Sequence, residues 1–132
     1  MHYSYRLYLN ASGKRVLGKG GAQILEAIDE YGSIVGASRK LRMSYKFVWD
    51  YLTRMRKRLK EPIILTHRGG TGRGKKKGGG GTTLTPLAKT LLKEYRSTEA
   101  LVNHALRSKK ISVTLRRHIV TSRPKANLKR KT

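Results

Sequence analysis

Residues 33–58, SIVGASRKLRMSYKFVWDYLTRMRKR, constrain the fold more than any other part of the chain. Ile34, Ala37, Ser38 and Leu41 give a short first helix one small and apolar face. Arg42 and Met43 predict a tight turn, and Ser44 suits an N-cap because its hydroxyl can accept a free backbone N–H of the next turn. A second helix follows, because apolar residues then recur at i, i+4, i+7 and i+11: Val48, Leu52, Met55 and Leu59. Two helices joined by a three-residue turn are a helix-turn-helix.

The other face of this second helix is polar and basic. It carries Tyr45, Lys46, Arg54, Arg56, Lys57 and Arg58. In a helix-turn-helix the second helix enters the major groove of DNA, where such side chains contact bases and phosphates. An ordinary helical hairpin with a solvated basic face has the same pattern, so the rest of the chain must separate the two interpretations.

The charge balance favours a nucleic-acid partner. The 132 residues include 31 basic and 7 acidic side chains, a formal net charge of +24, which nucleic acid most commonly neutralises. The charge is also uneven: residues 1–32 are nearly neutral, whereas residues 39–60 hold nine basic side chains and one acid, and residues 62–93 and 100–132 hold no acid. A merely solvated surface would mix both signs.

Other classes of function find little support in the sequence. No apolar run approaches the roughly 20 residues of a membrane span, and the first ten residues do not resemble a signal peptide. We therefore expect a protein of the cytoplasm, associated with the nucleoid. The chain has no cysteine, and its four histidines lack the spacing of zinc ligands. Gly69–Lys75 fits the start of a phosphate-binding loop, but Lys76 replaces the hydroxyl residue that holds Mg²⁺. We expect no catalytic residue, metal or cofactor, and no enzyme.

The segment before the helix-turn-helix predicts a strand or hairpin and a helix. Residues 2–9 alternate in the period of a half-buried strand, residues 10–14 form a turn, and residues 15–17 could return as a second strand. Gly18–Gly21 should break this pattern. A helix over 22–31 follows, and Gly32 is placed as a C′ glycine.

The segment after the helix-turn-helix predicts a wing. Glu61-Pro62 stops helical structure, and the short runs 63–66 and 82–84 favour strands on either side of a glycine- and lysine-rich loop, 67–81. Glycines there would permit close approach to a phosphate backbone. A disordered linker between two domains is the alternative. The predicted phosphate-binding residues of the wing are Arg68, Arg73, Lys75, Lys76 and Lys77.

A long helix and a basic tail complete the chain. Thr85 is the expected N-cap and Pro86 the first helical residue. The helix is apolar on more than one side, so we expect a second copy of the chain to cover part of it. The predicted dimer-interface residues are Leu87, Leu91, Leu92, Tyr95, Leu101, Val102 and Leu106. Packing within its own domain is the alternative. Residues 107–132 are predicted to be a basic arm or a solubilising tail.

In combination, these segments resemble the DNA-binding domain of ModE-type regulators, within the LysR-like winged-helix group. The resemblance rests on EAIDEYGSI (26–34), LRMSYKFVWD (41–50), the glycines at 78–81 and LTPLAK (84–89), and it covers residues 3–106. It implies a homodimer that is clasped through the long last helix and places two recognition helices in successive major grooves. The chain departs from the family in three ways: Arg42 stands where the turn usually has glycine, the basic charge is higher, and we expect no C-terminal oxyanion-binding module and hence no molybdate sensing.

The predicted fold is therefore α+β and mainly α: a winged helix-turn-helix with an N-terminal strand or hairpin and a long C-terminal dimerisation helix. We expect one domain over 1–106, comprising the helix-turn-helix (33–59), the wing (62–84) and the dimerisation helix (85–106). A tail over 107–132 follows. Trp49 is expected to anchor the second helix against the first, with a DNA contact as the alternative.

The expected partners are double-stranded DNA and a second copy of the chain, with no membrane and no evident small-molecule effector. Ser44, Tyr45 and Lys46 are the candidates for base contacts. Phosphates should be contacted by Arg39, Lys40, Arg42, Arg54, Arg56, Lys57 and the wing. The favoured function is a transcription regulator, and the main alternative is an architectural, chromatin-like protein that coats DNA. Binding of RNA or of the ribosome is suggested by charge alone.

Overall fold

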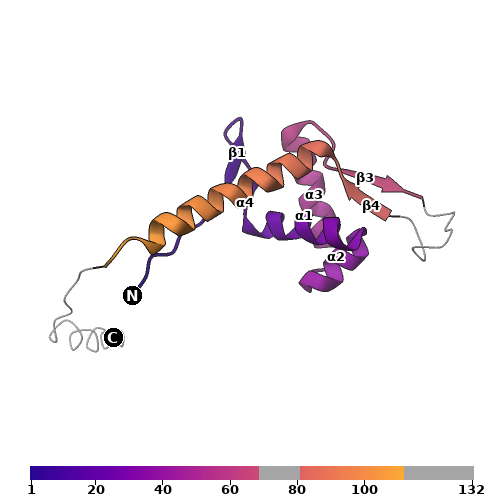
Figure 1. Ribbon diagram of the computed structural model, residues 1–132. Coiled ribbons are helices and arrows are strands. Elements are labelled where there is room, and N and C mark those ends of the chain that lie inside the picture. The colour runs from indigo at the N-terminus through magenta and orange to yellow at the C-terminus, as the bar shows by residue number, and fades with distance from the viewer. Residues whose placement is uncertain (69–80, 112–132) are drawn as a thin grey trace, which may run out of the picture.

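The computed structural model describes residues 1–68 and 81–111. Four α-helices and two antiparallel two-stranded hairpins make up this part of the chain, in the order β1, β2, α1, α2, α3, β3, β4, α4 (Figure 1). The prediction of a mainly helical α+β fold is confirmed. The wing tip and most of the tail, residues 69–80 and 112–132, lie outside the described residues.

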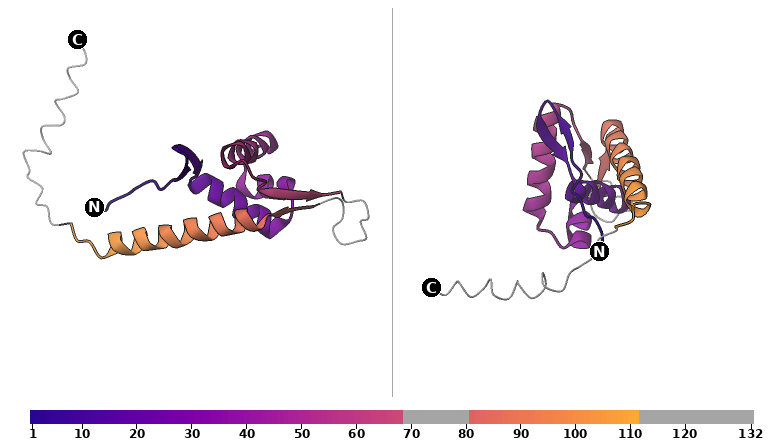
Figure 2. Two further views of the ribbon diagram at one scale, coloured as in Figure 1. Left: turned by 90° about the horizontal axis from the view of Figure 1, so that it is seen from above. Right: turned by 90° about the vertical axis from the view of Figure 1, so that its left-hand side faces the viewer.

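The N-terminal hairpin is shorter than the sequence pattern suggested. Strands β1 (Leu9–Ala11) and β2 (Lys14–Leu17) pair through a turn with positive φ at Ser12 and Gly13. The expectation of a strand over residues 2–9 is wrong, because residues 2–8 run beside the last helix instead of pairing with a strand (Figure 2). There the Tyr5 hydroxyl donates to Asn103 Oδ1 at 2.5 Å. Of residues 2–8 only Leu7 is partly buried, so the alternation of apolar residues overstated how much of this segment is buried.

Helix α1 (Lys19–Tyr31) is the centre of the core. The strand pattern ends at Leu17 as predicted, but the helix begins at Lys19, three residues before the predicted start at residue 22. Gly32 ends the helix as expected: its φ of 68° is left-handed, and its N–H donates to the Ile28 carbonyl at 2.8 Å. Six of its residues are buried: Gly21, Ala22, Ile24, Leu25, Ala27 and Ile28.

The remaining elements pack around α1. Helices α2 (Ile34–Leu41) and α3 (Tyr45–Leu59) cover one side, and β2 contributes Leu17, which is fully buried. Strands β3 (Ile64–His67) and β4 (Gly81–Leu84) pair from Ile64 with Leu84 to His67 with Gly81. Strand β4 is fixed to the end of α1, because the Thr82 N–H donates to the Gly32 carbonyl at 2.8 Å.

Helix α4 (Pro86–Arg107) runs along the whole molecule, and its C-terminal half extends past α1, α2 and α3 (Figures 1 and 2). Thr85 caps it, since the Thr85 hydroxyl accepts from the Ala88 N–H at 3.2 Å, and Pro86 follows as predicted. Arg96 ties α4 to α1 by donating to both carboxylate oxygens of Glu26, each at 2.6 Å. The position of α4 relative to α1 is therefore set by both apolar and charged contacts.

Candidate nucleic-acid interface

The structure contains the predicted helix-turn-helix. Ser33 caps α2 through a hydrogen bond from the Gly36 N–H at 2.8 Å, and Ser44 caps α3 through a hydrogen bond from the Phe47 N–H at 3.0 Å. Between the helices, Arg42 has φ 59° and ψ 40°, the left-handed conformation that glycine often supplies. The turn is held by the Met43 N–H, which donates to the Ser38 carbonyl at 3.0 Å.

Helix α3 has one face in the core and one in solvent. Val48, Leu52 and Met55 are at most 3% exposed, as the helical spacing predicted, and they fix the helix rigidly against the core. The cations predicted to contact DNA on this helix are all exposed: Lys46, Arg54, Arg56 and Lys57. Arg39, Lys40 and Arg42 from α2 and the turn are also exposed. A basic surface on a rigid helix suits contact with a polyanion.

The first turn of α3 presents Ser44, Tyr45 and Lys46 to solvent, which are the predicted base-contacting residues. Lys46 Nζ lies 2.9 Å from a carboxylate oxygen of Asp50, one turn later. This ion pair is highly exposed, with 83% and 51% of the two side chains accessible, so it contributes little to folding. Lys46 can therefore exchange Asp50 for another acceptor at small cost.

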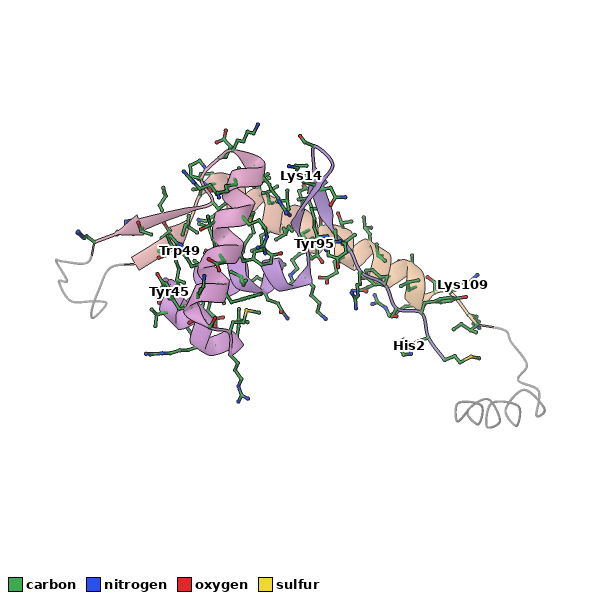
Figure 3. All side chains as sticks on the ribbon, turned by 180° about the vertical axis from the view of Figure 1, so that it is seen from behind. His2, Lys14, Tyr45, Trp49, Tyr95 and Lys109 are labelled. Carbon is green, nitrogen blue, oxygen red and sulfur yellow. The ribbon has the colours of Figure 1, made fainter. Side chains whose placement is uncertain are left out.

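Among the aromatic side chains of α3, Trp49 lies where the sequence did not predict it. Trp49 is 44% exposed and stacks on Tyr45, with ring centroids 6.4 Å apart and planes 6° apart. The expectation that Trp49 anchors α3 against the first helix is wrong. One helical step from buried Val48 turns Trp49 about 100° away from the core, toward the wing. Figure 3 shows Tyr45 and Trp49 on the wing side of α3.

The helical spacing could have revealed this position, because Trp49 shares its side of the helix with Tyr45 at i−4 and lies outside the Val48–Leu52–Met55 series. A small groove of about 210 Å³ lies beside the pair, lined by α2, α3 and the base of the wing. Together, Tyr45 and Trp49 form a flat apolar surface next to the basic one.

The two wing strands form as predicted. Each reaches one residue further toward the loop than the sequence suggested, β3 to His67 and β4 to Gly81. Arg68, which follows β3, is exposed. Arg73, Lys75, Lys76 and Lys77 lie outside the described residues. In Figure 3, α3 lies between the wing on one side and the β1–β2 hairpin on the other.

The residues predicted to form a dimer interface on α4 fall into three groups. Tyr95 is only 4% exposed and belongs to the chain's own core, where its hydroxyl donates to the Leu7 carbonyl at 3.0 Å. Burial raises the pKa of this hydroxyl. Five leucine and valine side chains are half-buried, two of them against the core: Leu87, Leu91, Leu92, Val102 and Leu106. Leu101 is 70% exposed.

The described residues offer little for other kinds of chemistry. Within residues 1–68 and 81–111, no group of three or more histidine, aspartate or glutamate side chains could hold a metal ion. In the same part of the chain, no helix has the length and hydrophobicity that crossing a membrane requires. The clearest shifts in pKa belong to the pair between α1 and α4: the hydrogen bond from Arg96 lowers the pKa of Glu26, and the same bond raises the pKa of Arg96.

Sequence comparison relates the chain to ModE-type proteins. It is 37% identical over 83 residues to the transcriptional regulator ModE of Haemophilus influenzae, covering 63% of this chain and 30% of that protein. It is 36% identical over 107 residues to the molybdenum-pterin-binding protein MopB of Rhodobacter capsulatus, covering 81% and 37%. It is 34% identical over 84 residues to the molybdenum transport protein ModE of Azotobacter vinelandii, covering 64% and 29%. None of these names describes an enzyme.

Similarity to solved structures is weaker. ArgP from Mycobacterium tuberculosis gives a TM-score of 0.47 at 18% identity, covering 66% of this chain and 28% of that one. The DNA complex of CbnR_DBD also gives 0.47, at 17% identity, covering 64% and 84%. No family model matches the chain. The chain spans about a third of the length of its curated relatives. Over the segment that these relatives share with it, the chain carries a ModE-like winged helix-turn-helix region.

Proposed function

We propose that this protein is a transcription regulator that binds double-stranded DNA as a homodimer, with α3 in the major groove and the wing on the phosphate backbone. The main support is the solvent face of α3. It presents Lys46, Arg54, Arg56 and Lys57 on a helix whose other face is buried in the core. The name of the Haemophilus relative, a transcriptional regulator, supports the same function.

Within this function we divide the contacts by chemistry. Ser44, Tyr45 and Lys46 read base edges, because they begin α3 and are exposed. Trp49 joins them as an apolar contact, since its ring stacks on Tyr45. Phosphates are contacted by the remaining cations: Arg39, Lys40, Arg42, Arg54, Arg56, Lys57, Arg68, Arg73, Lys75, Lys76 and Lys77.

We assign DNA binding and dimerisation to residues 1–106 and treat residues 107–132 as a basic extension. The second copy would pack on the exposed side of α4, around Leu101 and the half-buried Leu87, Leu91, Leu92, Val102 and Leu106. Tyr95 has little surface left for a partner. Such a protein would act on the nucleoid, in the cytoplasm.

The test is selection from a random duplex library at about 0.2 M salt, where counterions suppress non-specific binding. An enriched inverted repeat, with half-sites about one helical turn apart, is the result expected of a dimeric regulator. Retention of DNA without enrichment would instead favour the architectural alternative, to which the net charge of +24 already lends support. Failure to retain duplex DNA at low salt would refute both.

A second experiment tests which residues contact bases and which contact phosphates. Lys46→Ala should weaken binding to the selected site more than binding to random DNA. Replacement of Lys75, Lys76 and Lys77 by alanine should weaken both equally and reduce the dependence on salt by about 0.9 log units for each phosphate that the variant no longer neutralises. If each variant loses as much affinity for the selected site as for random DNA, the assignment of base and phosphate contacts is wrong.

A further inference from the structure

A large cleft lies on the side of α3 that faces away from the wing. Its volume is about 720 Å³, and it is bounded by the N-terminal segment, β2, the start of α1, α3 and α4. Figure 3 shows this region between α3 and the N-terminal hairpin, on the side where Tyr95 and Lys14 are labelled. The helix-turn-helix and the wing do not account for this cleft.

The cleft is strongly cationic. Five basic side chains line it: Arg6, Arg15, Lys19, Arg54 and Arg58. Its one acid, Glu99, is already paired with Arg96, whose Nη1 lies 2.7 Å from Glu99 Oε1. In the part of the chain that the structure describes, none of the five cations forms an ion pair with a carboxylate. A concave surface that gathers unpaired cations attracts an anion.

Several of these cations are held in place by neighbouring groups. The Arg15 guanidinium lies 3.7 Å from the centre of the Tyr8 ring, and the Arg54 guanidinium lies 5.1 Å from that of Tyr51. Arg58 donates from Nη1 to the Arg15 carbonyl at 2.5 Å, which joins α3 to the hairpin. Contacts with rings and carbonyls position the guanidinium groups but leave their charge uncompensated.

The start of α1 adds backbone donors to the same cleft. Gly18, Lys19 and Gly20 line it. The amides in the first turn of a helix have no intrahelical acceptor, and the N-cap residue Gly18 has no side chain to accept from them. Tyr51 closes over Gly21, where a Cβ atom would collide with the phenol ring. At Gly20, by contrast, a Cβ atom would meet nothing within 4 Å.

We propose that this cleft binds a phosphate group of the DNA backbone, from the strand on the side of α3 opposite the wing. DNA is the source because Arg54 belongs both to the cleft and to the basic face of α3, so a duplex on that face brings a backbone to the cleft. The recognition helix is then held between two phosphate contacts, one from the wing and one from the cleft. This inference rests on the proposed function of α3.

Gly20→Asp tests the proposal, because it adds a carboxylate to the cleft at a position with free space. An acidic residue in the first turn of a helix favours the helix, and aspartate is a better helix former than glycine. The variant should therefore keep or exceed the wild-type melting temperature. Its affinity for duplex DNA should fall about five- to tenfold at 0.1 M salt, and its salt dependence should fall by about 0.9 log units.

Two controls match the change in size and in charge. Gly20→Asn adds a similar side chain without charge and should bind DNA nearly as the wild type does. Lys93→Gln makes the same change in net charge at an exposed position of α4, the helix that runs behind α3 in Figure 3. It should change affinity less than twofold.

The outcomes separate this proposal from the function on which it depends. If the wild type fails to bind duplex DNA, the proposed function fails. If the wild type binds and Gly20→Asp behaves like Lys93→Gln, the cleft proposal alone is overturned. A third arm adds inorganic phosphate at millimolar concentration and compares melting temperatures. If phosphate raises the melting temperature of the wild type alone while both proteins bind DNA equally, the cleft binds a free anion, and the proposal that it binds DNA is overturned.

Discussion

At the residue scale, the loop between α2 and α3 and the first helical turn of α3 determine which side chains would contact DNA. Arg42 adopts a left-handed conformation, which is uncommon for a residue with a Cβ atom. The surrounding hydrogen bonds hold it there and leave its side chain exposed. In the first turn of α3, Lys46 is paired with Asp50, which is the one acid of this helix.

Asp50→Asn should raise affinity for DNA of any sequence about twofold to tenfold and should reduce discrimination against random DNA. The substitution removes a charge that repels phosphates and releases Lys46 from an ion pair 2.9 Å long. Fluorescence anisotropy on the selected site and on random duplexes measures both effects. Asp29→Asn, which removes an exposed acid from α1, is the matched control. A loss of affinity for the selected site would mean that Asp50 itself reads a base, contrary to this prediction.

At the element scale, two junctions hold α4 against the rest of the molecule. One is Thr85, where the hydroxyl caps α4 and also donates to the Pro62 carbonyl at 3.0 Å, so the base of the wing and the start of α4 share one side chain. The other is the pair of Glu26 and Arg96 between α1 and α4. A wing that must reach a phosphate backbone needs a fixed base, and Thr85 supplies part of it.

Thr85→Val should lower the free energy of unfolding by about 1–3 kcal/mol, because a nearly isosteric side chain removes the helix cap and a hydrogen bond at a buried position. Thr85→Ser keeps the hydroxyl and should cost less. Urea unfolding followed by circular dichroism measures both variants. If Thr85→Val is as stable as the wild type and Thr85→Ser is destabilised, the methyl group, and not the hydroxyl, stabilises the junction.

The pair of Glu26 and Arg96 should make stability depend on pH in acid. Hydrogen bonding from Arg96 lowers the pKa of Glu26 below its ordinary value of 4.5. A carboxylate with a lowered folded-state pKa contributes stability that is fully present above the unfolded value and is lost as pH falls through the folded one. Since both side chains are about a third to a half exposed, we expect a contribution of about 1 kcal/mol or less.

Glu26→Gln should therefore destabilise the protein slightly at pH 7 and have no such effect at pH 2–3. Glu30→Gln, at an exposed position of the same helix, is the control and should be neutral at both pH values. Thermal unfolding at the two pH values measures the difference. If Glu26→Gln is still less stable than the wild type at the lower pH, the ion pair is not the cause of the lost stability.

At the scale of the whole molecule, α4 extends beyond the helix-turn-helix and presents Leu101 to solvent. Leu101→Asp should weaken the proposed dimer at least tenfold and reduce binding to an inverted repeat more than binding to a single half-site. Lys93→Gln lowers the net charge by the same amount at an exposed position of α4 on another face, and it should leave both unchanged. Sedimentation velocity at micromolar concentration measures the assembly. A wild-type protein that remains monomeric there would refute dimerisation through α4.

Much of this molecule follows from local sequence patterns. Serine and threonine caps, the C′ glycine and the spacing of Val48, Leu52 and Met55 predicted α2, α3 and the start of α4. These signals are local, because a cap acts within one helical turn and helical periodicity within a few. The uneven distribution of charged residues along the sequence likewise predicted the basic face of α3.

Other features depended on contacts between distant segments. Residues 2–8 have the alternation of a strand, yet they lie beside α4, where Tyr5 reaches Asn103. The glycines at 18–21 predicted a later start of the helix, yet α1 begins at Lys19, and the absence of a side chain at Gly21 leaves room for Tyr51 of α3. Helical spacing places Trp49 outside the buried series of α3, but only the packing of α3 against its neighbours puts it beside α2 and the wing strands.

The sequence by itself determined the helix-turn-helix, the wing strands and the sign of the charge, because each is encoded by residues within a few positions of one another. Only the tertiary structure decided that Tyr95 belongs to the core, that Trp49 faces the wing and that five cations from four separate segments line one cleft. The physical reason is that burial and clustering of charge depend on which surfaces meet, and those surfaces come from residues up to 98 positions apart.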